Sequence, residues 1–235
     1  MNKKRIIILS IVALVLAAVI VALAIIIPTV KRRREAEKFA QAMNDYYNAK
    51  VAQNEEENTE KYGVDVAFIG DSLTDGYDLN KYYTEFTVAN RGIGGDTTWG
   101  VEKRLKVSLY DINPRVVVMM IGTNNWYDMF DNYERILKDI KKNLPESKIV
   151  LMSIPPVGPH YNDRNHHYAF NNVKIKILAE KYSYTYVDIH SKLIDVNTEM
   201  LRSEYTTDDL HFTPLGYEVI TSTLKPVLLH LLGKS

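Results

Sequence analysis

The chain has 235 residues, of which 46% are hydrophobic, so it is long enough for one substantial core and an additional segment. Its 29 basic and 29 acidic residues balance, which gives a general nucleic-acid-binding role no electrostatic support. It contains no cysteine, and this excludes disulfides, thiolate metal sites and a cysteine nucleophile.

The first predicted element is a membrane-spanning helix over residues 6–27. This run is apolar apart from one serine, and it lies between the basic clusters Lys3–Arg5 and Lys31–Arg34. A helix of this length would rise about 33 Å at ~1.5 Å per residue, which matches the core of a bilayer. We therefore expect a single-pass anchor within residues 1–30.

A cleaved signal peptide is the alternative for this segment. Ala22-Leu23-Ala24 has the small-x-small form of a cleavage site, but apolar residues continue to Ile27 and a basic cluster follows, as beside an anchor. The cluster Lys31–Arg34 opposes export of the C-terminal side. We nevertheless expect an uncleaved signal-anchor with the rest of the chain outside the cytoplasm, because the segment before the run is very short and is easily retained inside.

Residues 31–61 predict a charged helical stalk. They begin basic, end acidic, and contain neither glycine nor proline. A narrow apolar stripe recurs at helical spacing: Phe39, Met43, Tyr46 and Tyr47. A helix that binds a partner or a lipid surface is the alternative, but a solvated stalk that can fold back on the next domain agrees better with the many charges.

From Tyr62 onward, strand and helix patterns alternate. Residues 129–144 (MFDNYERILKDIKKNL) carry apolar side chains on one helical face, whereas RVVVMMIG (115–122) and KIVLMSIPP (148–156) are apolar at successive positions. The second pattern is typical of parallel strands buried on both faces. The alternation predicts a three-layer α/β/α domain over residues 62–235. Its five parallel strands are expected at 64–70, 86–90, 115–121, 148–154 and 184–189.

Chemically informative residues lie at the predicted carboxyl ends of these strands, which is where parallel sheets bind ligands. The first strand ends in Gly70-Asp71-Ser72, and the second runs into NRGIGGDTT (90–98). The third ends in GTNN (122–125), and TTDDLHFTPLGY (206–217) follows late in the chain. We therefore expect one site, assembled from four loops at this edge of the sheet.

A phosphate cradle or a phosphatase is the weaker interpretation of this site. Glycines are dense at positions 92, 94 and 95, but no G-x-G-x-x-G follows the first strand and no Walker lysine is present. The sequence Asp71-Ser72-Leu73 lacks the second aspartate of a phosphatase. Position 74 is threonine, whereas the nucleophile turn of an α/β-hydrolase needs glycine there.

A serine nucleophile is better supported, because a base, an acid and oxyanion donors all have candidates. His211 can take the Ser72 proton as a neutral imidazole, and Asp208 can accept from the other ring nitrogen. The Ser72 N–H, a glycine N–H of the second loop and the Asn124 amide can form an oxyanion hole, where one donor is worth ~3 kcal/mol. Each feature alone has an ordinary explanation, such as a helix N-cap for the serine. Their joint occurrence favours an enzyme.

These four segments together resemble the SGNH hydrolase family, also called GDSL-type esterases and lipases. FIGDSLTDG (68–76), NRGIGGDTT, IGTNN (121–125) and DDLHFTPLGY (208–217) are similar to its successive sequence blocks. The resemblance covers about residues 62–232 and is strongest for the branch with platelet-activating-factor acetylhydrolase-like and carbohydrate O-acetylesterases. It implies a flavodoxin-like five-stranded parallel sheet and a serine esterase without cofactor or metal.

The resemblance gives each matching residue a role. Ser72 matches the nucleophile, Asp208 the acid and His211 the base. Ser72, Gly95 and Asn124 match the oxyanion hole.

Two positions depart from the family pattern. Asn125 replaces the usual aspartate of the third block, and Phe212 stands where proline is common. We expect altered local hydrogen bonding at Asn125, with the Asn124 donor retained.

Other candidates rank lower. Three histidines lie in a polar stretch after the fourth strand, where we expect a cleft wall or a solvated loop in preference to a metal site: His160, His166 and His167. His190 follows the fifth strand at the wrong spacing for the base, and we interpret it as structural. Three aromatic residues either wall the substrate site or pack in the core: Trp99, Trp126 and Tyr127.

The sequence therefore predicts a membrane-anchored serine esterase that hydrolyses small acyl esters, acetyl first, of carbohydrates or lipids. An O-acyltransferase with the same residues and a non-catalytic anchored binding module are the alternatives. The expected partners are a small ester substrate and a membrane, the latter through residues 6–27. No nucleic acid, cofactor or metal is expected.

Overall fold

The computed structural model describes residues 3–234, without the side chains of residues 6, 8–10, 12, 13, 15, 17 and 18. The chain divides into two compact units, Met1–Tyr46 and Tyr47–Ser235. Helix α1, Lys3–Lys61, includes the boundary, so its last turns belong to the second unit.

The part of α1 in the first unit is an exposed helix whose second half carries charged side chains. Ion pairs at i,i+4 spacing join Lys31 to Glu35 at 3.9 Å and Arg33 to Glu37 at 2.8 Å, and all four side chains are exposed. Such exposed pairs stabilise a helix by only a few tenths of a kcal/mol, about 0.3–0.5 each.

The membrane-spanning helix expected over residues 6–27 is not borne out. Among the residues that the structure describes, no helix supplies an apolar stretch long enough to cross a bilayer. The side chains of residues 6, 8–10, 12, 13, 15, 17 and 18, on which this expectation partly rests, lie outside the described residues. The location of the second unit outside the cytoplasm stays a prediction.

The second unit is built on a five-stranded parallel sheet in the order β2-β1-β3-β4-β5. This is the flavodoxin-like order, so the three-layer α/β prediction is confirmed. Each predicted strand is present: β1 Val66–Gly70, β2 Val88–Gly92, β3 Val116–Met120, β4 Lys148–Met152 and β5 Thr185–Val187. The chain passes from β1 outward to β2 and then returns to β3, which makes the carboxyl ends of β1 and β3 the topological switch point.

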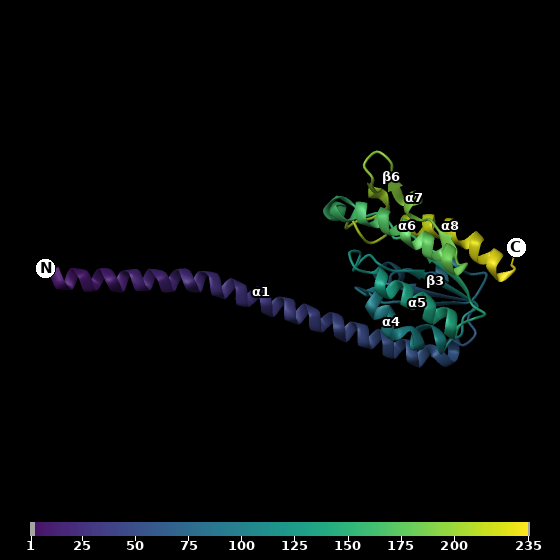
Figure 1. Cartoon of the computed structure of the whole chain (residues 1–235), viewed down its shortest axis with the longest axis horizontal. Helices are drawn as coiled ribbons and strands as arrows, with labels where there is room; N and C mark the ends of the chain where they lie inside the picture. Colours follow the sequence, from purple (N-terminus) through teal and green to yellow (C-terminus); the bar gives the residue numbers. More distant parts are fainter. Residues whose placement is uncertain (1–2, 235) are drawn as a thin grey trace. The chain divides into compact units, whose positions relative to one another are not determined.

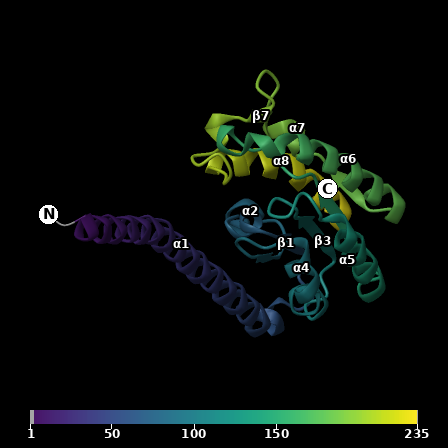
Figure 2. The same ribbon diagram turned by 60° about the vertical axis from the view of Figure 1, so that its left-hand side comes forward.

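Helices cover both faces of the sheet. The labelled strands of the parallel sheet, β3 in Figure 1 and β1 and β3 in Figure 2, lie between α8 on one side and α4 and α5 on the other. The longer helices are α4 Thr98–Leu105, α5 Phe130–Asn143, α6 Asn165–Tyr182 and α8 Pro214–Leu232. The shorter helices are α2 Ser72–Asp75, α3 Leu79–Tyr82, α7 His190–Leu193, the π-helix Lys106–Tyr110 and the 3₁₀ segments Pro159–Arg164 and Ser203–Tyr205. A small antiparallel pair, β6 Ile194–Asp195 and β7 Met200–Leu201, follows α7.

Successive side chains of a strand point to opposite faces of the sheet, so strands that are apolar at every position supply a core on each face. Ala67 and Ile69 of β1 pack into the cluster formed with α4, α5 and α6, whereas Val66 and Phe68 pack into the cluster formed with α8. Helix α5 faces the first cluster with side chains that are fully buried: Tyr133, Ile136, Leu137 and Ile140. Each fully buried apolar side chain of this kind contributes roughly 1.5–3 kcal/mol of transfer free energy.

The last turns of α1 also pack on this domain, beside the edge strand β2. The buried Arg91 of β2 donates to Asn54 and Glu57 at 2.9 Å each and to Asn58 at 3.1 Å. The compact unit therefore begins at Tyr47, earlier in the chain than the boundary at residue 62 expected from the sequence.

Candidate active site

Strand β1 brings Ser72 to the carboxyl edge of the sheet. β1 ends at Gly70, which is in register with Gly92 of β2 and Met120 of β3. A Cβ atom at Gly70 would overlap the Met120 carbonyl, so only glycine allows the strands to approach so closely at this point. Asp71 then caps α2 by accepting from the Leu73 N–H at 3.0 Å, which places Ser72 at the first position of the helix.

His211 and Asp208 reach the same place from a loop that precedes α8. His211 Nε2 lies 3.0 Å from Ser72 Oγ, and His211 Nδ1 lies 2.7 Å from Asp208 Oδ2. The loop is closed by a bridge between Thr206 and Phe212, and α8 begins two residues further on. The structure therefore brings the predicted nucleophile, base and acid into one hydrogen-bonded chain.

Asp208 is held as a carboxylate. Its other oxygen, Oδ1, accepts from the backbone N–H groups of Leu210 and His211 at 3.0 and 2.7 Å. Burial alone would raise the pKa of Asp208, but the hydrogen bonds from the His211 ring and from these two N–H groups lower it to about 2. The carboxylate is therefore ionised at neutral pH and orients the imidazole through a charge-assisted bond.

The three predicted oxyanion donors lie on three different loops. Gly95 has φ +74°, and the Asp96 N–H donates to the Ile93 carbonyl at 3.1 Å, which closes a four-residue turn. A positive φ at the third position is the mark of a type II turn and favours glycine. The N–H groups of Ser72 and Gly95 have no acceptor among the described residues. Both are therefore available to an anion.

The Asn124 side chain is held in place by a hydrogen bond that uses one of its two amide hydrogens. Its Nδ2 donates to the Asp96 carbonyl at 2.8 Å, and its side chain is otherwise exposed. Because a side-chain amide has two N–H bonds, the second remains for a ligand.

Asn125, which replaces the usual aspartate, forms hydrogen bonds through both the oxygen and the nitrogen of its side-chain amide. Its Oδ1 accepts from the Thr98 N–H at 3.2 Å, and its Nδ2 donates to the Thr98 hydroxyl at 2.7 Å. That hydroxyl in turn donates to Asn132 of α5 at 2.8 Å. An amide is both donor and acceptor, so Asn125 ties the third loop to the start of α4 while Asn124 keeps its place.

A buried ion pair supports the second loop, and the sequence patterns did not single it out. Arg104 Nε lies 2.8 Å from Asp96 Oδ2, and the two side chains are 1% and 3% exposed. The same guanidinium donates to the carbonyls of Gly70 and Arg91 at 3.0 and 2.7 Å. Burial raises the pKa of Asp96, and Arg104 opposes this effect. An arginine eight residues after the loop aspartate, on the inner face of an amphipathic helix, is the signal that could have identified it.

Asp71 is a second buried acid beside Ser72. Its side chain is fully buried, and its Oδ2 has no hydrogen-bond partner among the described residues. Burial raises the pKa of Asp71 to about 6, an effect that the bond from the Leu73 N–H and the nearby Thr123 hydroxyl oppose.

The remaining histidines do not join this chain of hydrogen bonds. His190 Nδ1 contacts the Ile154 carbonyl at 3.0 Å, and burial lowers the pKa of His190. The rings of His166 and His167 contact each other in a tilted arrangement, and His167 also contacts Trp126 at 4.3 Å between ring centroids. Within the described residues no cluster of side chains is suited to a metal ion.

Two aromatic residues follow the second and third loops and remain candidates for the substrate walls. The side chains of Trp99 and Tyr127 are 40% and 68% exposed, too open for core residues. Their contact with a substrate stays a prediction.

Comparison with known proteins agrees with this geometry. Residues 68–219 match the model of the GDSL-like Lipase/Acylhydrolase family, a range that contains all four loops. The chain belongs to this family. It is accordingly a carboxylic ester hydrolase.

Curated relatives of this GDSL-like acylhydrolase include platelet-activating factor acetylhydrolase IB subunit alpha2 from Homo sapiens and Rattus norvegicus. Each is 30% identical over 186 residues, which span 73% of this chain and 79% of the relative. Among solved structures, a protein from Streptococcus pneumonia described as a platelet activating factor superposes with a TM-score of 0.76 at 26% identity, covering 82% of this chain and 97% of that one. Axe2, an acetylxylan esterase from Geobacillus stearothermophilus, shares the fold with a TM-score of 0.59 at 20% identity, covering 73% and 95%.

Proposed function

We propose that this GDSL-like hydrolase cleaves small acyl esters, acetyl first, with Ser72, His211 and Asp208 as a catalytic triad. One observation carries the proposal: a continuous chain of hydrogen bonds runs from Ser72 Oγ through both nitrogens of His211 to Asp208, at 3.0 and 2.7 Å. A non-catalytic binding module has no need of such a chain.

The chemistry follows from which atoms hold the protons. With the proton on Nδ1 donated to Asp208, His211 Nε2 accepts the Ser72 proton while Oγ attacks the ester carbonyl carbon. The carbonyl π electrons move to oxygen, and the N–H groups of Ser72 and Gly95 and the Asn124 amide bind that oxyanion. When the intermediate collapses, the bond to the alcohol breaks and His211 gives its proton to the departing oxygen.

Water completes the cycle by the same steps. His211 takes a proton from a water molecule while the water oxygen attacks the carbonyl carbon of acyl–Ser72. The proton then passes to Ser72 Oγ as the carboxylic acid product leaves. No redox step or external co-reactant is needed.

The substrate class is drawn from the relatives. These include a platelet-activating factor acetylhydrolase and an acetylxylan esterase, both named for acetyl groups. An acetylated glycan or lipid is therefore the proposed substrate. An O-acyltransferase uses the same residues, and only the acceptor that receives the acyl group distinguishes it.

The test is the hydrolysis of p-nitrophenyl esters of increasing acyl length by the full chain. Ser72→Ala should abolish turnover without changing the circular-dichroism spectrum. Ser222→Ala, at an exposed serine of α8, is the matched control and should be fully active. We expect the acetyl ester to be cleaved fastest. Undiminished turnover by a folded Ser72→Ala variant would disprove the triad, and a maximum at long chains would disprove the acetyl preference.

Product analysis with an added sugar acceptor separates hydrolysis from transfer. Free acetate as the main product supports the hydrolase, and an acetylated sugar as the main product supports the transferase.

A further inference from the structure

The Gly95 N–H belongs to the central peptide of its turn, which the contacts of Arg104 and Asn124 with Asp96, at the end of the turn, do not hold directly. This peptide joins Gly94 to Gly95, and both residues have the wide conformational range of glycine. A type II turn converts to type I by rotation of this peptide, which would reverse the direction of the Gly95 N–H. The turn is closed at its ends by the Ile93–Asp96 hydrogen bond, and this bond alone does not fix the central peptide.

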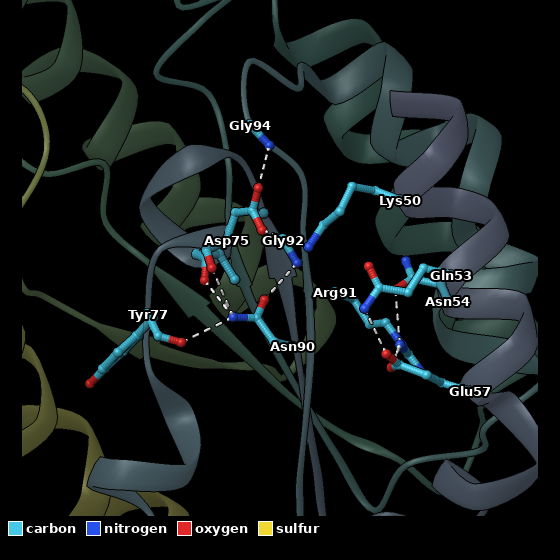
Figure 3. Close-up of polar contacts among 12 residues, drawn as sticks. Lys50, Gln53, Asn54, Glu57, Asp75, Tyr77, Asn90, Arg91, Gly92 and Gly94 are labelled. Atoms are coloured by element: carbon cyan, nitrogen blue, oxygen red, sulfur yellow. Dashed lines mark hydrogen bonds and ion pairs between the residues drawn. The ribbon is translucent and has the colours of Figure 1, made fainter. Parts of the chain in front are cut away.

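Asp75 supplies the missing restraint. Its Oδ2 accepts from the Gly94 N–H at 3.0 Å, directly before the peptide that carries the Gly95 N–H (Figure 3). Asp75 is the last residue of α2, the helix that begins at Ser72. One short helix thus carries the proposed nucleophile at its first residue and the support of an oxyanion donor at its last.

Asp75 is in turn held by Lys50 of α1. Lys50 Nζ lies 2.9 Å from Asp75 Oδ1, and the two side chains are only 25% and 13% exposed (Figure 3). Lys50 lies outside residues 68–219, the part of the chain that matches the family model. The contact is therefore made by a segment that the family model does not include, the last turns of α1.

We propose that Asp75 and Lys50 are positioning residues for the oxyanion hole. Asp75 fixes the Gly94 N–H so that the Gly95 N–H faces the reacting carbonyl. Lys50 orients the Asp75 carboxylate and neutralises it. An unpaired carboxylate behind this donor would repel the negative charge that develops in the transition state. The proposal rests on the proposed function, because it assigns Gly95 to the oxyanion hole.

The experiment measures kcat and KM of the full chain with p-nitrophenyl acetate. Removal of a whole oxyanion donor lowers kcat by roughly 10²–10³, so its misplacement in Asp75→Ala should lower kcat by at least about tenfold with little change in KM. Lys50→Met should lower kcat by a smaller factor, and Lys50→Arg, which keeps the charge, should restore it. In the double variant the loss should equal that of Asp75→Ala alone, because Lys50 acts only through Asp75.

Lys225→Met is the matched control. Lys225 lies 2.9 Å from Glu85 and is 26% exposed, so it reproduces the separation of the Lys50 pair and the burial of its lysine away from the proposed site, with a more exposed acid, Glu85, at 43%. It should leave kcat unchanged.

The outcomes separate this proposal from the one on which it rests. If Ser72→Ala is inactive while Asp75→Ala and Lys50→Met keep the kcat of Lys225→Met, the positioning role is wrong and the triad stands. If losses in the double variant multiply, Lys50 does not act through Asp75 and the relay is wrong. If Asp75→Ala does not fold, the test rests on the Lys50 variants: a lower kcat in Lys50→Met that is restored in Lys50→Arg supports the positioning role, and an unchanged kcat in both overturns it. Retained activity in Ser72→Ala would instead overturn the proposed function itself.

Discussion

At the residue scale, the proton on the His211 ring decides whether the proposed triad can work. Asp208 accepts from two backbone N–H groups through Oδ1, so Oδ2 is left to face His211 Nδ1 at 2.7 Å. An ionised carboxylate can only accept, which places the proton on Nδ1 and leaves Nε2 free to accept from Ser72. The backbone around Asp208 therefore selects the tautomer that a general base requires.

Asn124 offers a direct test of oxyanion binding. Asn124→Ala should lower kcat by roughly 10²–10³ with a smaller change in KM, because its free N–H acts mainly in the transition state. Steady-state kinetics with p-nitrophenyl acetate measure both constants. A rise in KM at constant kcat would instead make Asn124 a residue that binds the substrate in its ground state.

Asp71 should make stability depend on pH. Its pKa is about 6 in the folded chain, against 3.8 for an ordinary aspartate, so the folded state keeps a proton that the unfolded state has already lost. The stability contributed by this group is present below pH 3.8 and is lost as the pH rises through about 6. Asp71→Asn removes the charge and keeps a side-chain oxygen for the Leu73 N–H.

Thermal melts at pH 4 and pH 7.5 measure this effect. The melting temperature of Asp71→Asn relative to the natural protein should be higher at pH 7.5 than at pH 4. Asp163→Asn, at an exposed position, is the control, and its melting temperature should differ from that of the natural protein by the same amount at both pH values. An Asp71→Asn difference independent of pH would contradict the buried, high-pKa assignment.

At the element scale, α4 joins the ends of two strands through Arg104. The guanidinium donates to the last residue of β1, Gly70, and to Arg91 of β2, and it pairs with Asp96 in the second loop. Arg104→Met should cost about 3–5 kcal/mol of unfolding free energy, because it leaves a buried carboxylate without its partner. Denaturant unfolding measures the loss.

A second substitution shows whether the unpaired charge is the cause. In the Arg104→Met background, Asp96→Asn should recover part of the stability, since a buried amide costs less than a buried carboxylate. A double variant less stable than Arg104→Met would show that the loss comes from the packing of α4.

The strands were predictable because their chemistry repeats along the sequence. RVVVMMIG has an apolar residue at nearly every position, and β3 occupies Val116–Met120 within it. By contrast, the two-residue strands β6 and β7 and the π-helix at Lys106–Tyr110 were not predicted, since elements this short have no periodicity to detect.

The meeting of the candidate site residues was predictable for a different reason. Ser72, Asp208 and His211 were selected from residue type and position at strand ends, and the structure places them within hydrogen-bond distance of one another. Asp75 and Lys50 were missed because their importance lies in tertiary contacts between distant segments, which sequence spacing does not reveal.

At the scale of the whole molecule, the domain includes the end of α1. Residues 54–58 are polar and charged, so their sequence indicates a solvated helix, yet Asn54 and Asn58 are 4% and 8% exposed. Burial of polar residues against Arg91 leaves no apolar stripe, so the sequence does not reveal this packing, and the boundary expected at residue 62 stays a prediction.

Two fragments test this boundary. A fragment that starts at Tyr47 keeps all partners of Arg91, whereas one that starts at Tyr62 leaves a guanidinium without them. We expect the shorter fragment to be less stable by about 3–5 kcal/mol in denaturant unfolding. Arg91→Met in the longer fragment is the control, and it should lose less than the truncation does. Equal stability of the two fragments would contradict a structural role for residues 47–61.

The hydrogen bond between Ser72 and His211 closes a loop of 139 residues. The entropy of closing a loop rises only slowly with its length, but contacts so distant in sequence form late in folding. During synthesis, β1 and β2 are complete long before the ribosome reaches residue 211, so a growing chain can pair its first strands before the proposed triad can form. Regain of esterase activity after dilution from denaturant would accordingly report the docking of the C-terminal loop, a later event than the collapse that buries the sheet.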